Sequence, residues 1–418
     1  MNRVNIDWQI KMDRDRPWMR AADAAARLGV TRATLYAYVS RGLVRSQPAA
    51  GAPRARGYAR DDIERLRRRT EERRDPDKAA ARALQWGLPI LESAITLIDG
   101  SRLYYRGRDA AALARSHSIA QVAALIWQAE AEPPLDAKHT PHVGAALRGR
   151  APSRRRSGTR FASRAQSTLA AAADAAPPFD GRAASAARCG WRIVHLLTEA
   201  ATGAPVGSRS IDEALAHAWG VRGRGVDVLR AAIILCADHE LNVSSFTARC
   251  VASAGSDPYT VVIAGLAALQ GPRHGGAAAR VEAMLASMRR ARPLGGAVAA
   301  RLRRGEHLEG FGHPLYPSGD PRAALILGLL RECCAASREL AFVLEFARMA
   351  SAAVSDRPNL DFALAAAARV LRLPAGAPLM LFAIGRSIGW IGHAIEQYAT
   401  GQLIRPRAKY VGPPPAVP

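Results

Sequence analysis

The stretch from residue 235 to residue 276 reads LCADHELNVSSFTARCVASAGSDPYTVVIAGLAALQGPRHGG. Its middle is apolar, with small residues at helical spacing and almost no charge, which predicts a buried helix pair in a large core. A histidine lies near each end: His239 beside polar residues, and His274 in a Gly-Pro…Gly-Gly turn with little bulk to crowd a ligand. A lone histidine is usually a hydrogen-bonded structural residue, so the function of this pair depends on the rest of the chain.

Further punctuated motifs follow in order along the chain. They are Gly310-Phe311-Gly312-His313-Pro314, Asp320-Pro321-Arg322, Asn359-Leu360-Asp361-Phe362, Leu381-Phe382-Ala383-Ile384-Gly385-Arg386 and Ile404-Arg405-Pro406-Arg407-Ala408. With the first stretch they resemble the citrate synthase family, whose signs are D-H-E-x-N, G-P-x-H-G-G, G-[FY]-G-H with D-P-R shortly after, N-x-D-F, and a closing F-A-x-x-R…R-P-[RK]. The resemblance covers roughly residues 85–415, and five ordered motifs do not coincide by chance.

The resemblance implies a role for seven side chains. Asp361 would be the base that takes a proton from the acetyl methyl group of acetyl-CoA. His274 would hydrogen-bond the enol oxygen, and His313 would polarise the ketone of oxaloacetate. The citryl-CoA formed would be hydrolysed in the same site. The resemblance implies no metal or redox cofactor, and coenzyme A enters as the thioester substrate. The residues implied to hold oxaloacetate and the developing citrate are His239, Arg322, Arg386 and Arg405, and the last crosses from the partner subunit in the family, which implies a homodimer.

The residue types alone match this chemistry without singling it out. Carbon–carbon bond formation from acetyl-CoA needs a base, a donor for the enol oxygen and a donor for the acceptor carbonyl. A keto-diacid also needs cations, and bidentate arginine suits carboxylates best. The simpler alternatives are that Asp361 caps a helix starting at Phe362 and that Arg386 and Arg405 are surface residues. The remaining histidines are too scattered for a zinc site, so no metal is predicted.

Composition limits the class of protein. The chain has 418 residues, 49% of them hydrophobic, which is enough for two or three domains of a globular protein. The N-terminus has no apolar signal-peptide region. The sequence contains no run of about 18 uncharged apolar residues, so no membrane span is predicted. Five cysteines without a C-x-x-C pair are typical of reduced thiols in a cytoplasmic protein. The net charge of +23 permits binding to nucleic acid or to a phosphate-rich cofactor.

Residues 18–74 predict a small separate domain. A helix through Leu28, a turn at Gly29, a second helix capped by Thr31, a loop or β wing at 46–56 and a third helix starting at 57–63 resemble the winged helix-turn-helix of the MerR and excisionase type. Residues 1–74 contain 18 Lys+Arg and 9 Asp+Glu, hence a charge of 18 − 9 = +9. DNA binding and a packing or regulatory relic are both open. The candidate DNA-binding residues are Thr31, Arg32, Thr34, Tyr36, Arg54 and Arg56.

The remaining chain predicts a mainly α fold. A short β hairpin turning at Asp99-Gly100 is followed by helical patterns, including helices at 277–292, 322–339 and 340–355, while residues 131–187 are the least informative. By resemblance, the fold is that of citrate synthase, with two helical domains. The expected domains are a polar tail (1–17), the helix-turn-helix domain (18–74), the first part of the large domain (80–274), the small domain (275–360) and the rest of the large domain (361–418).

Three departures from the family pattern leave the substrate open. Arg273 replaces an apolar residue, three alanines follow Gly276, and residues 314–317 are Pro-Leu-Tyr-Pro where many members have a basic residue. The last puts the coenzyme A phosphate contacts in doubt. The sequence therefore predicts a citrate synthase using acetyl-CoA and oxaloacetate. The alternatives are a 2-methylcitrate synthase using propionyl-CoA, and a DNA-binding regulator whose synthase-like domain senses acyl-CoA or oxaloacetate.

Overall fold

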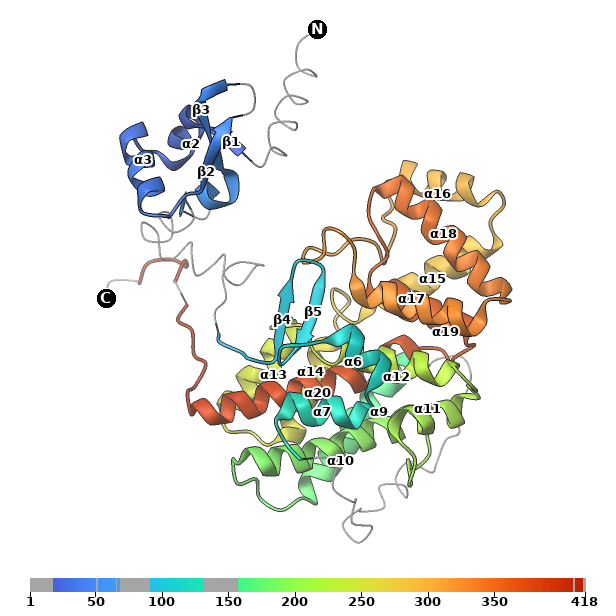
Figure 1. The fold of residues 1–418 in the computed structure, drawn as a ribbon. Helices are drawn as coiled ribbons and strands as arrows, with labels where there is room; N and C mark the ends of the chain where they lie inside the picture. The colour runs from blue at the N-terminus through green and yellow to red at the C-terminus, as the bar shows by residue number, and fades with distance from the viewer. Residues whose placement is uncertain are drawn as a thin grey trace. The chain divides into compact units, whose positions relative to one another are not determined.

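A computed structural model describes residues 18–49, 52–64, 66–67, 91–130, 157–408 and 410–415. The chain divides into two units, Met1–Glu92 and Ser93–Pro418 (Figure 1). The predicted polar tail, residues 68–90 and residues 131–156 lie outside the described residues.

The first unit is a helix-turn-helix followed by a β hairpin. Gly29 ends the first helix in the left-handed region (φ 66°), and the Thr31 hydroxyl caps the second by accepting a hydrogen bond from the Thr34 amide at 3.2 Å. Both features were expected from the sequence and are confirmed. The hairpin is the predicted wing, and the sheet has the strand order β1-β3-β2. The elements are β1 (Trp18–Arg20), α2 (Ala21–Leu28), α3 (Arg32–Ser40), β2 (Ser46–Ala49) and β3 (Ala52–Ala59).

The third helix of this unit begins later than the sequence predicts. Residues 57–59, expected at its start, belong to β3 and pair with β1, and helical residues begin at Arg60. The physical reason is the burial of Tyr58, which packs with Leu35 and Ile63 in the core of the unit. As a strand, residues 57–59 pair with β1 and place Tyr58 in the core, so the sheet extends as far as the core requires.

The second unit is almost wholly helical, as the sequence predicts. It opens with a three-stranded sheet, and Gly100 takes a positive φ of 60° in the predicted hairpin turn. The strands are β4 (Thr96–Asp99), β5 (Arg102–Tyr105) and β6 (Arg108–Asp109). The helices up to the central pair are α6 (Ala110–Ser116), α7 (Ile119–Trp127), α9 (Ser157–Asp174), α10 (Ala183–Thr202), α11 (Ile211–Trp219) and α12 (Gly225–Cys236).

The central pair forms as predicted, and the helices after it differ in their ends. Helices α13 (Val243–Ser253) and α14 (Pro258–Leu269) are capped by Asn242 and Asp257. The helix predicted at 322–339 ends earlier, at Cys334, and the one predicted at 340–355 begins earlier, at Arg338, where the Ser337 hydroxyl caps it. The remaining helices are α15 (Gly276–Arg290), α16 (Leu294–Arg303, not predicted), α17 (Pro321–Cys334), α18 (Arg338–Val354), α19 (Leu360–Val370) and α20 (Ala377–Thr400).

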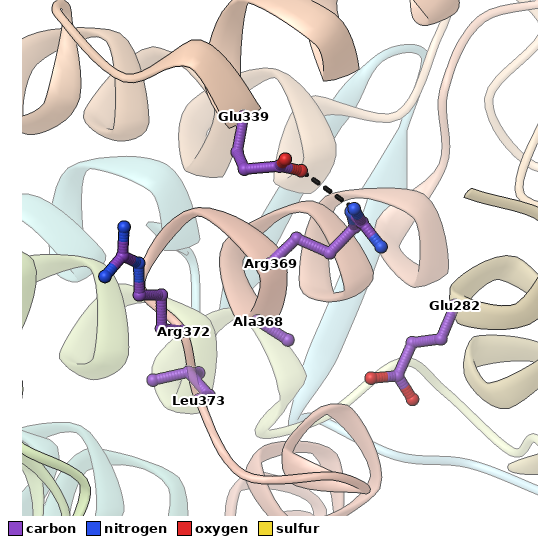
Figure 2. A pocket seen from close by; sticks show the side chains of 6 residues that line it. All are labelled: Glu282, Glu339, Ala368, Arg369, Arg372 and Leu373. Atoms are coloured by element: carbon purple, nitrogen blue, oxygen red, sulfur yellow. Dashed lines mark hydrogen bonds and ion pairs between the residues drawn. The ribbon is translucent and has the colours of Figure 1, made fainter. Parts of the chain in front are cut away.

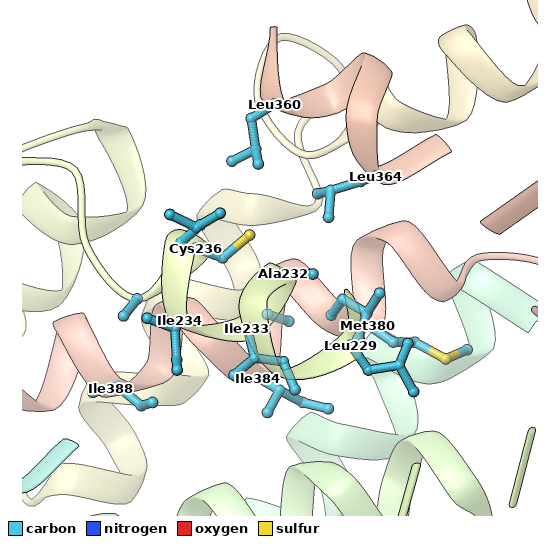
Figure 3. Packing of buried hydrophobic residues seen from close by; sticks show 14 of the residues in the cluster. Leu229, Ala232, Ile233, Ile234, Cys236, Leu360, Leu364, Met380, Ile384 and Ile388 are labelled. Atoms are coloured by element: carbon cyan, nitrogen blue, oxygen red, sulfur yellow. The ribbon is translucent and has the colours of Figure 1, made fainter. Parts of the chain in front are cut away.

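Helix α20 is the centre of the core of the second unit. It packs against α10, α12, α13 and α14, and Figure 3 shows its residues Met380, Ile384 and Ile388 beside those of α12. The close approach to α12 depends on two glycines. A Cβ on Gly385 would lie 2.4 Å from the Ile233 carbonyl oxygen, and one on Gly389 would lie 2.3 Å from that of Ala237.

By length and composition α20 could also cross a membrane, since its mean hydropathy over 18 residues is 1.2. However, 89% of that window is buried inside the unit. A long apolar helix surrounded by other helices is what the core of a large globular protein requires. We therefore interpret α20 as a core helix.

All five cysteines carry free thiols.

Candidate active site

The loop between α12 and α13 carries the first candidate histidine and is fixed through its neighbour Asp238. This buried carboxylate accepts a hydrogen bond from the Thr96 hydroxyl at 2.6 Å and lies 3.1 Å from Nε2 of His393 on α20. Burial alone would raise the pKa of Asp238, but His393 and Arg386 hold it below the ordinary value. The loop therefore has a buried, ionised anchor.

His239 lies buried next to this anchor. Its Nε2 is 2.9 Å from the Tyr316 hydroxyl, and its ring centroid is 5.1 Å from that of His313. Burial, together with the positive charges of Arg322 and Arg386, lowers its pKa well below the ordinary 6.5. The ring is therefore neutral at physiological pH.

His274 occupies the tight turn between α14 and α15. The turn is closed by hydrogen bonds from the His274 amide to the Gly271 carbonyl and from the Gly275 amide to the Leu269 carbonyl, both 3.0 Å. Nε2 of His274 lies 2.8 Å from the hydroxyl of Ser244, at the start of α13. Burial, with a smaller effect of Arg386, lowers the pKa of His274 to about 4. This ring too is neutral at physiological pH.

The loop of His313 is bonded to the loop that precedes α19. The Gly312 amide donates to the Arg357 carbonyl at 2.8 Å, and the Asn359 side-chain amide donates to the Gly312 carbonyl at 3.0 Å. Burial and Arg322 lower the pKa of His313 to about 4. Its Nδ1 accepts a hydrogen bond from the Leu315 amide at 3.2 Å, so the proton of the neutral ring is on Nε2.

Asp361 does not cap a helix that starts at Phe362, as the simpler alternative supposed. Helix α19 begins at Leu360, and its cap is Asn359, whose Oδ1 accepts hydrogen bonds from the amides of Asp361 (3.1 Å) and Phe362 (3.3 Å). That alternative is wrong, because Asn359 already satisfies these amides and no carboxylate is needed. Burial raises the pKa of Asp361 to about 6, and Arg322 only partly opposes this.

Two of the three candidate arginines are buried among these groups. Arg322 donates to both carboxylate oxygens of Asp320 at 2.9 and 2.8 Å, and Asp320 also accepts from the Leu360 amide at 3.0 Å. Arg386, only 1% exposed, donates from Nε to the Cys236 carbonyl at 2.8 Å. The surface alternative is therefore wrong for Arg386. These bonds tie the start of α17 to that of α19, and α20 to the end of α12.

Arg405 does not join the cluster within its own chain. It is exposed, after the end of α20, and the neighbouring Ile404 amide donates to Ser253 at the far end of α13. Ser253 is nine residues along the helix from Ser244, or about 14 Å at 1.5 Å per residue. A contribution of Arg405 to the site of a partner subunit stays a prediction.

Several side chains that build this cluster were missed in the sequence. Tyr316, between His239 and Arg322, belongs to the Pro-Leu-Tyr-Pro segment that was interpreted only as a departure affecting coenzyme A. Ser244 follows D-H-E-L-N by two residues, and a polar residue on an apolar helix was an available signal. For His393 no signal was available in the sequence, because a histidine among apolar residues of a helix does not show that its partner is Asp238. Of the departures, Arg273 is exposed.

A pocket of about 340 Å³ lies away from the candidate residues, at the C-terminal end of α19 (Figure 2). Glu339 in it accepts hydrogen bonds from Arg369 and Arg289, both at 2.8 Å. Burial raises the pKa of Glu282, which faces the same pocket, to about 7. None of the seven predicted site residues lines it; the lining residues are Glu282, Glu339, Ala368, Arg369, Arg372 and Leu373.

The candidate DNA-binding residues of the first unit lie in and near α3 and the wing. Thr31, Arg32 and Arg56 are exposed, and Tyr36 is 53% exposed with its ring stacked 6.5 Å from Tyr58. Thr34 is partly buried and its hydroxyl lies 2.9 Å from that of Thr31. The side chain of Arg54 lies outside the described part of the chain. Within that part, no three His, Cys, Asp or Glu side chains are grouped as a metal site.

Comparisons with known families match both units. The profile described as "Citrate synthase, C-terminal domain" matches residues 80–407, and "MerR HTH family regulatory protein" matches residues 19–70. Citrate synthase 2 of Bacillus subtilis is 37% identical over 191 residues, which is 45% of this chain and 51% of the relative. The 2-methylcitrate synthase 1 of Corynebacterium glutamicum is 33% identical over 183 residues, or 43% and 48%. The matches thus span about half the length of these curated relatives.

Solved structures match over nearly their whole length. Citrate synthase of Thermotoga maritima superposes with a TM-score of 0.64 at 25% identity, covering 79% of this chain and 96% of that one. A ternary complex of carboxymethyl coenzyme A and oxaloacetate with citrate synthase of Thermoplasma acidophilum gives 0.63 at 25% identity, covering 80% and 97%.

Proposed function

Because the chain belongs to the citrate synthase family, we propose that it condenses acetyl-CoA with oxaloacetate to give citrate and coenzyme A. The observation that supports this most strongly is the grouping of neutral histidines, one carboxylate of raised pKa and two buried arginines from five separate segments of the chain. Burying so many ionisable groups costs free energy, and groups with such perturbed pKa values gather at functional sites. The ternary complex of the Thermoplasma relative is consistent with these two substrates.

In the proposed reaction Asp361 takes a proton from the methyl group of the thioester. Its pKa of about 6 leaves it ionised at neutral pH and makes it a stronger base than an ordinary carboxylate. The Ser244 hydroxyl, which donates to Asn242 Oδ1, lies 2.8 Å from Nε2 of His274 and fixes the ring, and a ring N–H of the neutral imidazole points to the thioester in this proposal. That N–H is then the donor for the enol oxygen, and a neutral donor of this kind stabilises charge as it develops.

The new carbon–carbon bond forms when the enol carbon attacks the keto carbon of oxaloacetate. Nε2–H of His313 donates to the ketone oxygen as it becomes an alkoxide, a role that its neutral tautomer permits. Arg322 and Arg386 hold the carboxylates, together with His239. Water then hydrolyses the thioester and releases coenzyme A. We propose this without a metal or redox cofactor, in a cytoplasmic homodimer in which Arg405 reaches the partner's site and residues 275–360 close over the substrates.

Assays of coenzyme A release test this proposal and the choice of acyl group. We expect oxaloacetate-dependent release of free thiol from acetyl-CoA, with the product identified as citrate by mass spectrometry. Propionyl-CoA is run alongside, because relatives named 2-methylcitrate synthase are nearly as similar as those named citrate synthase. A larger kcat/KM for propionyl-CoA would replace citrate by 2-methylcitrate as the product. Absence of release with both thioesters would contradict the proposed reaction.

We also propose that the first unit binds DNA, a function favoured by the MerR profile match and by exposed Arg32 and Arg56. Full-length protein is titrated onto random duplex DNA at several salt concentrations. We expect binding that weakens with salt, with the log–log slope smaller by about 1 for Arg32→Ala or Arg56→Ala if each contacts one phosphate. Arg348→Ala, an exposed arginine of α18, is the control. No binding at low salt would contradict this function.

A further inference from the structure

Tyr316 joins three candidate groups that the family motifs name separately. Its hydroxyl is 2.9 Å from Nε2 of His239, its ring centroid is 5.1 Å from that of His313, and the Arg322 guanidinium lies 5.3 Å from the same centroid. The side chain is buried, and its turn is fixed by a hydrogen bond from its own amide to the His313 carbonyl at 2.9 Å. The Tyr316 ring is therefore held in one place by the same loop that carries His313.

The hydrogen bond between Tyr316 and His239 has one consistent direction. Among the described residues, His239 Nε2 is the single hydrogen-bond partner of the Tyr316 hydroxyl. A buried O–H group needs an acceptor, and a neutral imidazole has one acceptor nitrogen and one N–H. If Nε2 carried the proton, the tyrosine proton would be left without an acceptor. The proton of His239 is thus on Nδ1, and Tyr316 donates to Nε2.

We infer that Tyr316 is a positioning residue that holds His239 as the neutral Nδ1–H tautomer, so that His239 binds the keto-diacid but does not compete with Asp361 as a base. This inference rests on the proposed function. Its physical basis is the engaged lone pair of Nε2, which is the atom that would otherwise accept a proton. Burial raises the pKa of Tyr316 to about 12, so the donor stays protonated at physiological pH. Arg322 and Arg386 add positive charge that keeps the imidazole neutral.

The direct test is the ¹⁵N spectrum of the imidazoles in protein labelled at histidine, with His239 assigned from the spectrum of His239→Gln. We expect Nδ1 of His239 to be protonated and Nε2 to have the shift of a hydrogen-bonded, unprotonated nitrogen. In Tyr316→Phe the Nε2 signal should move toward that of a free lone pair. A protonated Nε2 in the wild type, or an unchanged ring spectrum in Tyr316→Phe, would overturn the inference. This readout needs no turnover, so its result is separate from that of the proposed function.

Kinetics add a second readout. We expect Tyr316→Phe to raise KM for oxaloacetate about tenfold with little change in kcat, because a lost hydrogen bond to a substrate-holding group weakens binding in the ground and transition states alike. Tyr398→Phe is the matched control, since its hydroxyl donates to the Ser256 carbonyl away from these groups. It should leave both KM and the His239 spectrum unchanged. A fall in kcat for Tyr316→Phe with KM unchanged would contradict a role in substrate positioning.

Discussion

At the scale of single residues, burial rather than sequence motif sets the chemistry of the candidate site. His239, His274 and His313 are all neutral because each is desolvated next to arginine charge. The same burial makes Asp361 a carboxylate of raised pKa. A base that is costly to ionise and donors that carry no charge are what proton abstraction beside a carbonyl requires.

Replacing Asp361 by asparagine should stabilise the protein at neutral pH. The folded-state pKa of about 6 exceeds the ordinary 3.8, so the folded chain binds the proton more tightly than the unfolded chain. The wild type therefore loses stability as the pH rises from about 4 through 6, whereas the uncharged amide of the variant does not titrate. We expect the free energy of unfolding of Asp361→Asn, measured relative to that of the wild type, to be on the order of 1–3 kcal/mol higher at pH 8 than at pH 4. Urea unfolding at both pH values measures it, and a difference that is the same at both would contradict the burial account.

The sequence identified the residue types at this scale but not their partners. The motifs predicted His239, His274, His313, Asp361 and the arginines as candidates. Tyr316 and Ser244 act on those histidines through hydrogen bonds between segments about 77 and 30 residues apart in sequence. Such pairings depend on how helices pack, which spacing along one chain does not encode.

At the scale of elements, most of the candidate groups lie where helices begin or end, whereas Arg386 lies within α20. Asn359 caps α19 and bonds to the His313 loop, Asp320 caps α17 and bonds to the start of α19, and Asn242 caps α13. The side chains of Asn359 and Asp320 are thus each used twice, once to cap a helix and once to fix a neighbouring segment. The caps at Thr31 and Gly29 were predictable because they are local. The cap of α19 was not, since Asn359 and Asp361 are both good capping residues.

Replacing Asn359 should separate its two uses. Asn359→Ala removes the cap of α19 and should lower stability by about 1 kcal/mol. Asn359→Ser keeps a capping oxygen but is too short to reach the Gly312 carbonyl, and should retain most of the stability. Because both variants lose the bond to the His313 loop, we expect kcat to fall about tenfold in each, in line with misplacement of a catalytic group. Unfolding curves and initial rates measure the two effects. Full turnover in Asn359→Ser would show that the bond to Gly312 is dispensable.

Replacing Gly389 should separate α20 from the loop of His239. A Cβ there would lie 2.3 Å from the Ala237 carbonyl oxygen and 2.6 Å from Asp238 Oδ1. Neither atom can move without displacing the buried anchor, so we expect Gly389→Ala to cost about 3 kcal/mol or more of stability. Gly328→Ala in α17 is the control, since a Cβ there meets nothing within 4 Å and should be neutral or slightly stabilising. Equal stabilities of the two variants would contradict this view of the α12–α20 contact.

At the scale of the whole molecule, the family resemblance predicted the helical fold and the N-terminal helix-turn-helix, and both were confirmed by the profile matches and the solved structures. Local pattern alone predicts most of the helices, though not α16, and it does not predict their assembly. The central position of α20 depends on Gly385 and Gly389, and the need for glycine at these positions can be recognised only when the neighbouring helix is known. The homodimer and the division at residues 275 and 360 stay predictions.

Mixing two inactive variants tests whether Arg405 completes the partner's site. In a mixed dimer of Asp361→Asn and Arg405→Ala, a crossing arginine gives one site with both groups intact, so reassociation at equal amounts should restore about a quarter of wild-type activity. If Arg405 served its own chain, every site would lack one group. Each variant is refolded alone as the control. No recovery in the mixture, with dimers present by size-exclusion chromatography, would contradict a shared site.

Oxaloacetate-dependent release of coenzyme A by the wild type and by Asp361→Asn, with oxaloacetate binding followed by calorimetry in both, tests whether Asp361 is the base of a condensing site. We predict turnover in the wild type and a loss of at least about a thousandfold in the variant, the order expected when a base in general acid–base catalysis is removed. Binding of oxaloacetate should be retained, because Asp361 does not hold the keto-diacid. Equal turnover in the two proteins, or none in the folded wild type, would contradict the assignment of Asp361 as the base of a condensing site.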